Sequence, residues 1–380
     1  MKKNLLLRGG TIYSMWEAPF VGDIFLRDGK IAAIGTELDV PGAEVWDMSG
    51  KHIMPGLIDA HCHAGLLTSG TRDRDHNETS HPISPQMRGI DSINPFDPAF
   101  REALSGGVTS CLTGPGSINL IGGTFAAVKN RGNTVEDMLI EPNAAMKAAL
   151  GENPIFRYSQ QNKAPMSRMG AAALIRQALA SAEEYCPGRD RRDLGMEALR
   201  LVLERKIPLK IHCHRSDDIM TAIRICNEFN VRYTLDHCTE GYLIPDKLRA
   251  ALEKNCDGII IGPITGYKSK HELAGRIGWP LAVKLHEAGL PFAVMTDFYE
   301  QPTESLITNA AFIAAYGVPD DVAMKSVTLT AAKIIGLDDR VGSLQVGLDA
   351  DLAVFSGYPL DIRSLCEYTF IDGEVVYKRG

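Results

Sequence analysis

Several features that would restrict the function are missing from this sequence. No run of about eighteen apolar residues occurs, so no membrane-spanning helix is predicted. The N-terminal apolar run ends at Arg8 after three leucines, too short for the core of a signal peptide. The eight cysteines are scattered without a C-x-x-C pair, which indicates reduced thiols in place of a disulfide framework. A cytoplasmic location is therefore expected.

Clustered positive charge is missing too. The formal net charge is −7, and its 40 basic and 47 acidic residues are interspersed. Nucleic acids and anionic membranes favour a concentrated positive field, so neither is expected as a partner. The glycine-rich run after Thr113 lacks the Lys-Ser/Thr ending of a Walker loop. A small-molecule substrate is the expected partner, and the sequence leaves open whether the chain forms a homo-oligomer.

Both ends of the chain consist of short strand-like segments separated by turns. The stretch Arg27-Asp28-Gly29-Lys30 predicts a hairpin, and Asp351–Phe355 and Glu374–Tyr377 are strand-like segments near the other end. Because chain ends commonly lie close together, we expect residues 1–52 and 343–380 to form one composite β-sandwich domain.

Residues 53–342 alternate strand patterns with helix patterns. Helical spacing is typical of residues 219–226, 278–290 and 319–336. Strand-like segments recur at Ile53–Ala60, Val108–Thr113, Ala145–Leu150, Leu209–His214, Arg232–His237, Gly258–Pro263 and Phe292–Asp297. One further strand, near Thr124–Lys129, is poorly marked. Such alternation implies a parallel sheet, and about seven or eight units favour a closed (β/α)₈ TIM barrel in the α/β class.

Histidines and an aspartate occupy the ends of these predicted strands. They are His61, His63, His212, His214, His237 and Asp297. In a (β/α)₈ barrel the C-terminal strand ends converge on one face, where catalytic residues lie. Residues i and i+2 share one face of a strand, so His61 and His63 can bind one ion while Cys62 points away. A lone H-x-H motif is more often a pair of ordinary histidines, but this combined pattern is specific.

These residue types predict a metal-dependent hydrolase. Neutral imidazoles and a carboxylate suit divalent ions, and Zn²⁺ is the expected one. A metal held in this way lowers the pKa of a bound water and polarises a carbonyl oxygen. Asp297 can accept the proton of that water and pass it to a leaving nitrogen. His237, with the metal, is predicted to stabilise the developing oxyanion.

Two motifs resemble those of a known family. The segment Met54–His63 is similar to the first-strand signature of the amidohydrolase superfamily. Residues 336–352 resemble the segment by which chains of this superfamily lead from the barrel back into a small β-domain. The resemblance covers nearly the whole chain and points to the branch that includes imidazolonepropionase and metal-dependent dipeptidases. It implies a (β/α)₈ barrel with a β-sandwich built from both termini.

The resemblance also implies roles for individual residues. Asp297 would be the acid and base of the last strand. His212 is preferred to His214 because Lys210-Ile211-His212 matches the family pattern, and His214 would then contact the substrate or support a ligand. The implied metal ligands are His61, His63, His212, His237 and Asp297.

The number of metal ions depends on the fourth strand. Many two-metal members of the family have a carboxylated lysine there, whereas others have a glutamate or no ligand. Lys147 lies in an apolar run, where an unmodified amine is costly and a carbamate is a metal ligand. Alternatively, Lys147 lies at a helix start and its amine reaches solvent. Glu141 is the fallback ligand, and the sequence is compatible with one or two ions.

Other residues are candidates for binding the substrate. Arg88, Arg215, Tyr267 and Lys268 lie in predicted loops at the barrel mouth and could bind an anionic group, Arg215 being preferred. For each residue taken alone, a solvated surface position is the more common explanation. His76 and His81 lie in a polar loop that could cover the site.

The predicted activity is therefore hydrolysis of an amide-type C–N bond in a cyclic amide or peptide-like small substrate. The main alternative is a deaminase of a heterocyclic amine at a one-metal site. A catalytically silent scaffold is disfavoured, because such proteins usually lose ligands.

Overall fold

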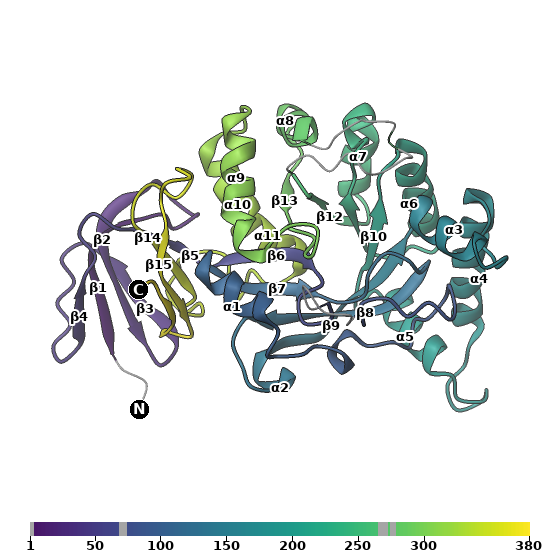
Figure 1. Ribbon diagram of the computed structural model, residues 1–380, viewed down its shortest axis with the longest axis horizontal. Coiled ribbons are helices and arrows are strands. Elements are labelled where there is room, and N and C mark those ends of the chain that lie inside the picture. The colour runs from purple at the N-terminus through teal and green to yellow at the C-terminus, as the bar shows by residue number, and fades with distance from the viewer. Residues whose placement is uncertain (1–3, 68–73, 265–272, 274–278) are drawn as a thin grey trace.

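The computed structural model describes residues 4–67, 74–264, 273 and 279–380, and all structural statements concern these residues. Tyr267 and Lys268 lie outside them. The strands form two eight-stranded sheets that lie beside each other, one built from both chain ends and one surrounded by helices (Figure 1).

The first sheet joins the two ends of the chain. Strand β5 pairs in parallel with β1 and antiparallel with β14, so it connects the N-terminal strands to the C-terminal ones. The predicted hairpin is confirmed, with β2 and β3 antiparallel on either side of Asp28 and Gly29. The strands are β1 (Leu5–Ile12), β2 (Phe20–Arg27), β3 (Lys30–Gly35), β4 (Glu44–Asp47), β5 (His52–Pro55), β14 (Leu352–Phe355), β15 (Cys366–Ile371) and β16 (Glu374–Lys378).

The second sheet is a nearly closed barrel whose strands follow one another in chain order. Its strands are β6 (Leu57–Cys62), β7 (Val108–Thr113), β8 (Ile121–Lys129), β9 (Leu139–Ala149), β10 (Leu209–Cys213), β11 (Tyr233–His237), β12 (Cys256–Ile261) and β13 (Phe292–Val294). The two edges meet where the Asp297 amide, just beyond β13, donates to the His61 carbonyl in β6 at 3.2 Å. The predicted barrel is therefore present in a mixed α/β fold.

The barrel sheet differs from the expected parallel arrangement at β8. This strand, the one that the sequence marks poorly, runs antiparallel to both β7 and β9. Only residues 114–120 connect β7 to β8, and they contain no helix. Parallel neighbours need a crossover of a dozen or more residues, so this short connection requires the reversed direction.

A glycine divides the predicted strand Ile53–Ala60 into β5 and β6. A Cβ atom on Gly56 would lie 2.2 Å from Oγ1 of Thr109, a distance that no side chain tolerates. The chain leaves the terminal sheet at Pro55 and enters the barrel at Leu57. The prediction of a single strand was therefore wrong. Because Gly56 has no side chain, the chain can pass close to β7 at this position.

Helices lie along the outside of the barrel (Figure 1). The predicted helix over residues 319–336 is two helices, and the second ends at Gly336 in the left-handed conformation. No helix in the described part of the chain is long and apolar enough to cross a membrane. The helices are α1 (Pro98–Ser105), α2 (Val135–Met138), α3 (Glu152–Ser159), α4 (Arg168–Glu184), α5 (Leu194–Leu203), α6 (Ser216–Glu228), α7 (Pro245–Leu252), α8 (Trp279–Glu287), α9 (Leu306–Ala315), α10 (Asp320–Ser326) and α11 (Leu329–Ile335).

Candidate metal centre

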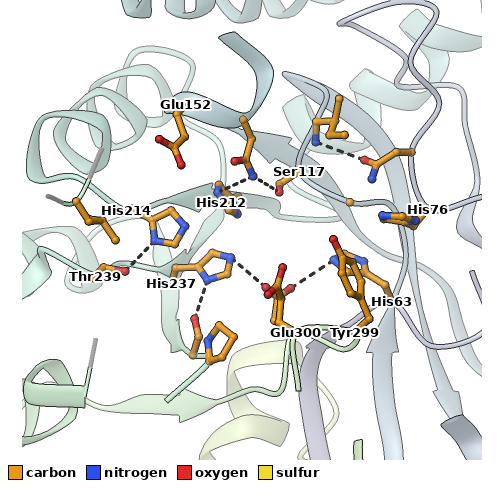
Figure 2. Close-up of a pocket in the computed structure, with 18 of the residues that line it drawn as sticks. His63, His76, Ser117, Glu152, His212, His214, His237, Thr239, Tyr299 and Glu300 are labelled. Carbon is orange, nitrogen blue, oxygen red and sulfur yellow. Dashed lines mark hydrogen bonds and ion pairs between the residues drawn. The ribbon is translucent and has the colours of Figure 1, made fainter. Parts of the chain in front are cut away.

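The polar residues at the strand ends come together in two groups. One consists of His61, His63 and Asp297, and the other consists of His212, His214 and His237. Within each group, one ligand atom per residue lies within 4.8 Å of the others. All five histidines are buried. Figure 2 shows His63 on one side of the site and His212, His214 and His237 on the other, with carboxylates between them.

Asp297 belongs to the first group and also faces the second. Its Oδ1 atom is 3.5 Å from Nε2 of His61 and 3.4 Å from Nε2 of His63, and its Oδ2 atom is 3.9 Å from Nε2 of His237. The carboxylate therefore faces histidines of both groups. A backbone φ of 53° places Asp297 in the left-handed region, which few non-glycine residues occupy. This conformation aims the side chain into the site just past the end of β13.

The hydrogen bonds of three histidines leave their Nε2 lone pairs facing the site. Nδ1 of His63 lies 2.7 Å from the Gly114 carbonyl, and Nδ1 of His237 lies 2.7 Å from the Gly262 carbonyl. A carbonyl oxygen only accepts, so each Nδ1 carries a proton, and in the neutral ring the lone pair is then on Nε2. Nδ1 of His61 is 2.8 Å from a carboxylate oxygen of Asp236, with the same consequence.

The charge state of these rings suits a metal as well. Burial, with help from nearby positive charges, holds the pKa values of His61 and His237 well below the ordinary value, so both rings are neutral. Their Nε2 atoms are buried without a hydrogen-bond partner among the described residues. Neutral imidazole with an unsatisfied lone pair is the form that binds a divalent ion, so the donor set fits a metal.

Lys147 lies in the interior of the barrel near both groups. It belongs to β9 and not to a helix, and its side chain is fully buried, with no hydrogen-bond partner for Nζ among the described residues. The alternative of a helix-start lysine that reaches solvent is therefore wrong. Burial lowers the pKa of Lys147 to about 8, and its charge acts on both His61 and His237. The fallback ligand, Glu141, is exposed earlier in β9.

A buried carboxylate behind the site was not predicted from the sequence. Asp236 contacts Nδ1 of His61 with one oxygen and lies 3.2 Å from Nζ of Lys210 with the other. All three side chains are buried. Contacts of this kind fix the tautomer and the orientation of a metal-ligating histidine.

The family model for the amidohydrolase family matches residues 52–378. The chain belongs to the amidohydrolase family. This membership makes it an enzyme, a hydrolase acting on carbon–nitrogen bonds.

Similar proteins cover the chain almost completely. Amidohydrolase tasK of Hapsidospora irregularis is 28% identical over 96% of this chain, which spans 40% of the length of that protein. Imidazolonepropionase of Maricaulis maris is 26% identical, with 92% of this chain and 90% of that protein covered. An amidohydrolase crystal structure from Thermotoga maritima MSB8 superposes with a TM-score of 0.94 at 37% identity, covering 99% of this chain and 100% of that one. The chain is thus related to the imidazolonepropionase branch.

In this amidohydrolase His63, His212, His214, His237 and Asp297 line a cavity of about 770 Å³. His76 also lines the cavity, with its ring 5.7 Å from that of His63, whereas His81 is exposed. Burial and the neighbouring His63 lower the pKa of His76 to about 3. Of the two histidines proposed to cover the site, only His76 reaches it.

The predicted anion-binding residues are placed differently. His214 lines the cavity, with Nδ1 2.8 Å from Oγ1 of Thr239. Arg88 and Arg215 do not line it. Arg88 is exposed, and Arg215 forms two hydrogen bonds with Asp217 at the start of α6. The sequence placed Arg215 next to His214, but the chain turns away from the barrel mouth at that residue to begin the helix.

Proposed function

We propose that this chain is a metal-dependent amidohydrolase that cleaves an amide-type C–N bond, cyclic or peptide-like, in a small molecule. The observation that best supports this is the pair of donor groups on either side of Asp297, with neutral histidines whose Nε2 lone pairs face the site. The expected cytoplasmic location, the absence of a nucleic-acid partner and the division into residues 1–52 with 343–380 and residues 53–342 remain predictions.

Two divalent ions, most simply Zn²⁺, suit these residues. His61 and His63 would hold one, and His237 with His212 or His214 would hold the other. Lys147, as a carbamate, would supply a ligand to both, since its buried amine lies near residues of each group. Divalent metals in such sites lower the pKa of a water and polarise a carbonyl oxygen.

Asp297 has the position of a general base and acid. Its carboxylate faces both donor groups and is 14% exposed to the cavity, so it can take a proton from water and return it to a leaving nitrogen. His237 was predicted to stabilise an oxyanion. In the neutral ring of His237, Nδ1 donates its proton to the Gly262 carbonyl, so Nε2 has no proton to donate. We therefore assign His237 the role of a metal ligand.

Two donor groups with Lys147 near both favour amide hydrolysis over the one-metal deaminase. A silent scaffold is not favoured either, because His61, His63, His212, His237 and Asp297 are all present and belong to the two groups of possible metal ligands.

The proposal is tested by replacing the carboxylate of Asp297. Asp297→Asn keeps the shape of the side chain and removes its basicity, so we expect kcat on any hydrolysed amide to fall about 10²- to 10⁴-fold. Product amine release from a panel of cyclic and acyclic amides is the measurement, with Asp246→Asn on α7 as the control. If the metal-loaded wild type hydrolyses no amide, or if Asp297→Asn retains full kcat, the proposal fails.

A further inference from the structure

We infer that the substrate carries a carboxylate and that Arg157 binds it. This inference rests on the proposed function and specifies the class of amide that the site accepts. Arg157 is the only arginine or lysine among the described residues that line the cavity. Of the residues predicted from the sequence for this role, Arg88 and Arg215 do not line the cavity, and Tyr267 and Lys268 lie outside the described residues.

Helix α3 presents one face to the cavity. The lining residues of this face recur at helical spacing and are Glu152, Asn153, Phe156, Arg157 and Gln160. Nδ2 of Asn153 lies 3.4 Å from Nε2 of His212, so this part of α3 touches the proposed metal centre. Arg157 lies four residues further along, about 6 Å along the helix axis. A ligand bound at the centre would therefore extend toward Arg157 along α3.

One N–H of Arg157 is buried without an acceptor. Its half-buried side chain donates from Nη2 to Oγ1 of Thr79 at 2.9 Å, and Nε is buried without a hydrogen-bond partner among the described residues. No carboxylate among the described residues forms an ion pair with this guanidinium, whereas Arg215 is paired with Asp217. Leaving the buried Nε–H without an acceptor costs free energy. A ligand carboxylate would supply the missing acceptor.

The rest of the lining favours a carboxylate over a phosphate. Glu152, Glu300 and Asp297 also line the cavity, and the amide of Glu300 donates to the Asp297 carbonyl, which places Glu300 at the metal end. A single guanidinium among the described lining residues suits one negative charge better than a dianion. Apolar side chains line the cavity as well, Phe156, Ile264 and Leu281 among them, and they suit a short hydrocarbon segment. The expected substrate has a scissile amide at one end and a carboxylate at the other.

The test compares matched pairs of amides that differ only in a carboxylate or a neutral carboxamide remote from the scissile bond. For the wild-type holoenzyme we expect the carboxylate member to have the higher kcat/KM. Arg157→Met should raise the KM of the carboxylate member about 10- to 100-fold and leave the carboxamide member within about twofold. Arg157→Lys should restore part of the difference. Arg88→Met is the matched control, because it removes an exposed guanidinium outside the cavity and should change neither member.

A binding measurement separates failure of this inference from failure of the proposed function. Glutarate and glutaramide are titrated calorimetrically into wild-type and Arg157→Met holoenzyme of equal metal content and melting temperature. We expect glutarate to lose about tenfold or more of its affinity in the variant. Equal effects of Arg157→Met on both members of a pair, or unchanged glutarate affinity, would overturn the role of Arg157. If the wild type hydrolyses no amide, the proposed function fails, and the glutarate titration alone decides about Arg157.

Discussion

At the scale of single residues, the site depends on side chains that violate strand alternation. Asp236 and His237 are consecutive in β11, so a regular strand would point them to opposite faces. His237 has a φ of 65°, and both side chains contact residues of the site: Asp236 contacts His61, and His237 faces Asp297. The i, i+2 pattern predicts His61 and His63 correctly as neighbours, but it gives no reason to expect Asp236 behind them.

Asp236 should control metal affinity without touching the metal. Asp236→Asn weakens the acceptor for Nδ1 of His61, so we expect metal affinity to fall about 10- to 100-fold. Competition with a chromogenic chelator measures this affinity. The control is Asp257→Asn, which loses a carboxylate paired with Arg232 at the start of β12. Equal affinities of Asp236→Asn and wild type would show that this contact does not support the ligand.

Arg157 could not be predicted from sequence patterns. It lies on a helix between two barrel strands, and its importance depends on two facts of tertiary structure. Those facts are the direction in which α3 packs and the lack, among the described residues, of a carboxylate paired with the guanidinium. Arg88 and Arg215 were predicted because they follow predicted barrel strands or lie in predicted loops at the barrel mouth. Neither of them lines the cavity.

At the scale of elements, barrel strands with a continuous apolar run were predictable from the sequence, and β8 was not. Strands β7, β10 and β11 coincide with predicted segments because continuous apolar runs identify buried strands. Strand β8 contains glycines and alanines and ends at Lys129, so its apolar signal is weak. Its direction follows from the short connection to β7, which sequence patterns do not reveal.

The reversed direction of β8 places Lys129 in a buried cluster of charges next to the terminal sheet. Nζ of Lys129 is 2.8 Å from Asp349, 3.1 Å from Asp351 and 2.6 Å from Asp372. Burial raises the pKa of Asp351 to about 6 despite Lys129. Burial would also raise the pKa of Asp349, but hydrogen bonds from Lys129 and Lys30 bring it to about 2. The cluster connects the barrel to the sheet formed by the chain ends.

Lys129→Met should destabilise the fold in a pH-dependent way. Removing the amine leaves the buried Asp351 without a cationic partner among the described residues, so we expect the free energy of unfolding to fall by about 3–5 kcal/mol at pH 7. Asp349 keeps its ion pairs with Lys30 and Arg340. Without Lys129, we expect the pKa of Asp349 to rise from about 2 and the pKa of Asp351, which burial already raises to about 6, to rise further. A carboxyl with a raised pKa stabilises the fold below its unfolded pKa and loses this contribution as the pH rises. The deficit of the variant should therefore grow as the pH rises through about 6, where Asp351 of the wild type ionises.

Urea unfolding of wild type and Lys129→Met at pH 4 and pH 7 measures this deficit. Lys30→Met is the control, because Lys30 pairs with the same Asp349 but its side chain is 50% exposed. We expect the control to change stability by about 1 kcal/mol or less. An equal deficit of Lys129→Met at both pH values would contradict the account.

At the scale of the whole molecule, the two chain ends build one sheet and the middle builds the barrel that holds the site. The composite sheet was expected because both chain ends have the same pattern of short strands and turns. Strand β5 joins the two ends by pairing with both β1 and β14. The position at which the chain passes from the terminal sheet into the barrel was not predicted, because it depends on the close approach of Gly56 to Thr109. The site itself combines residues of β6, β9, β10 and β11 with Asp297 beyond β13, so only the closed barrel assembles it.

The central claim is that this barrel holds two metal ions with Lys147 between them. Metal content per chain, measured by inductively coupled plasma mass spectrometry on wild type and Lys147→Ala, tests it most directly. We predict two equivalents in the wild type and one in Lys147→Ala, because the variant lacks the amine that a carbamate requires. Wild-type protein that binds no divalent metal, or Lys147→Ala protein that keeps both ions at unchanged affinity, would contradict the claim.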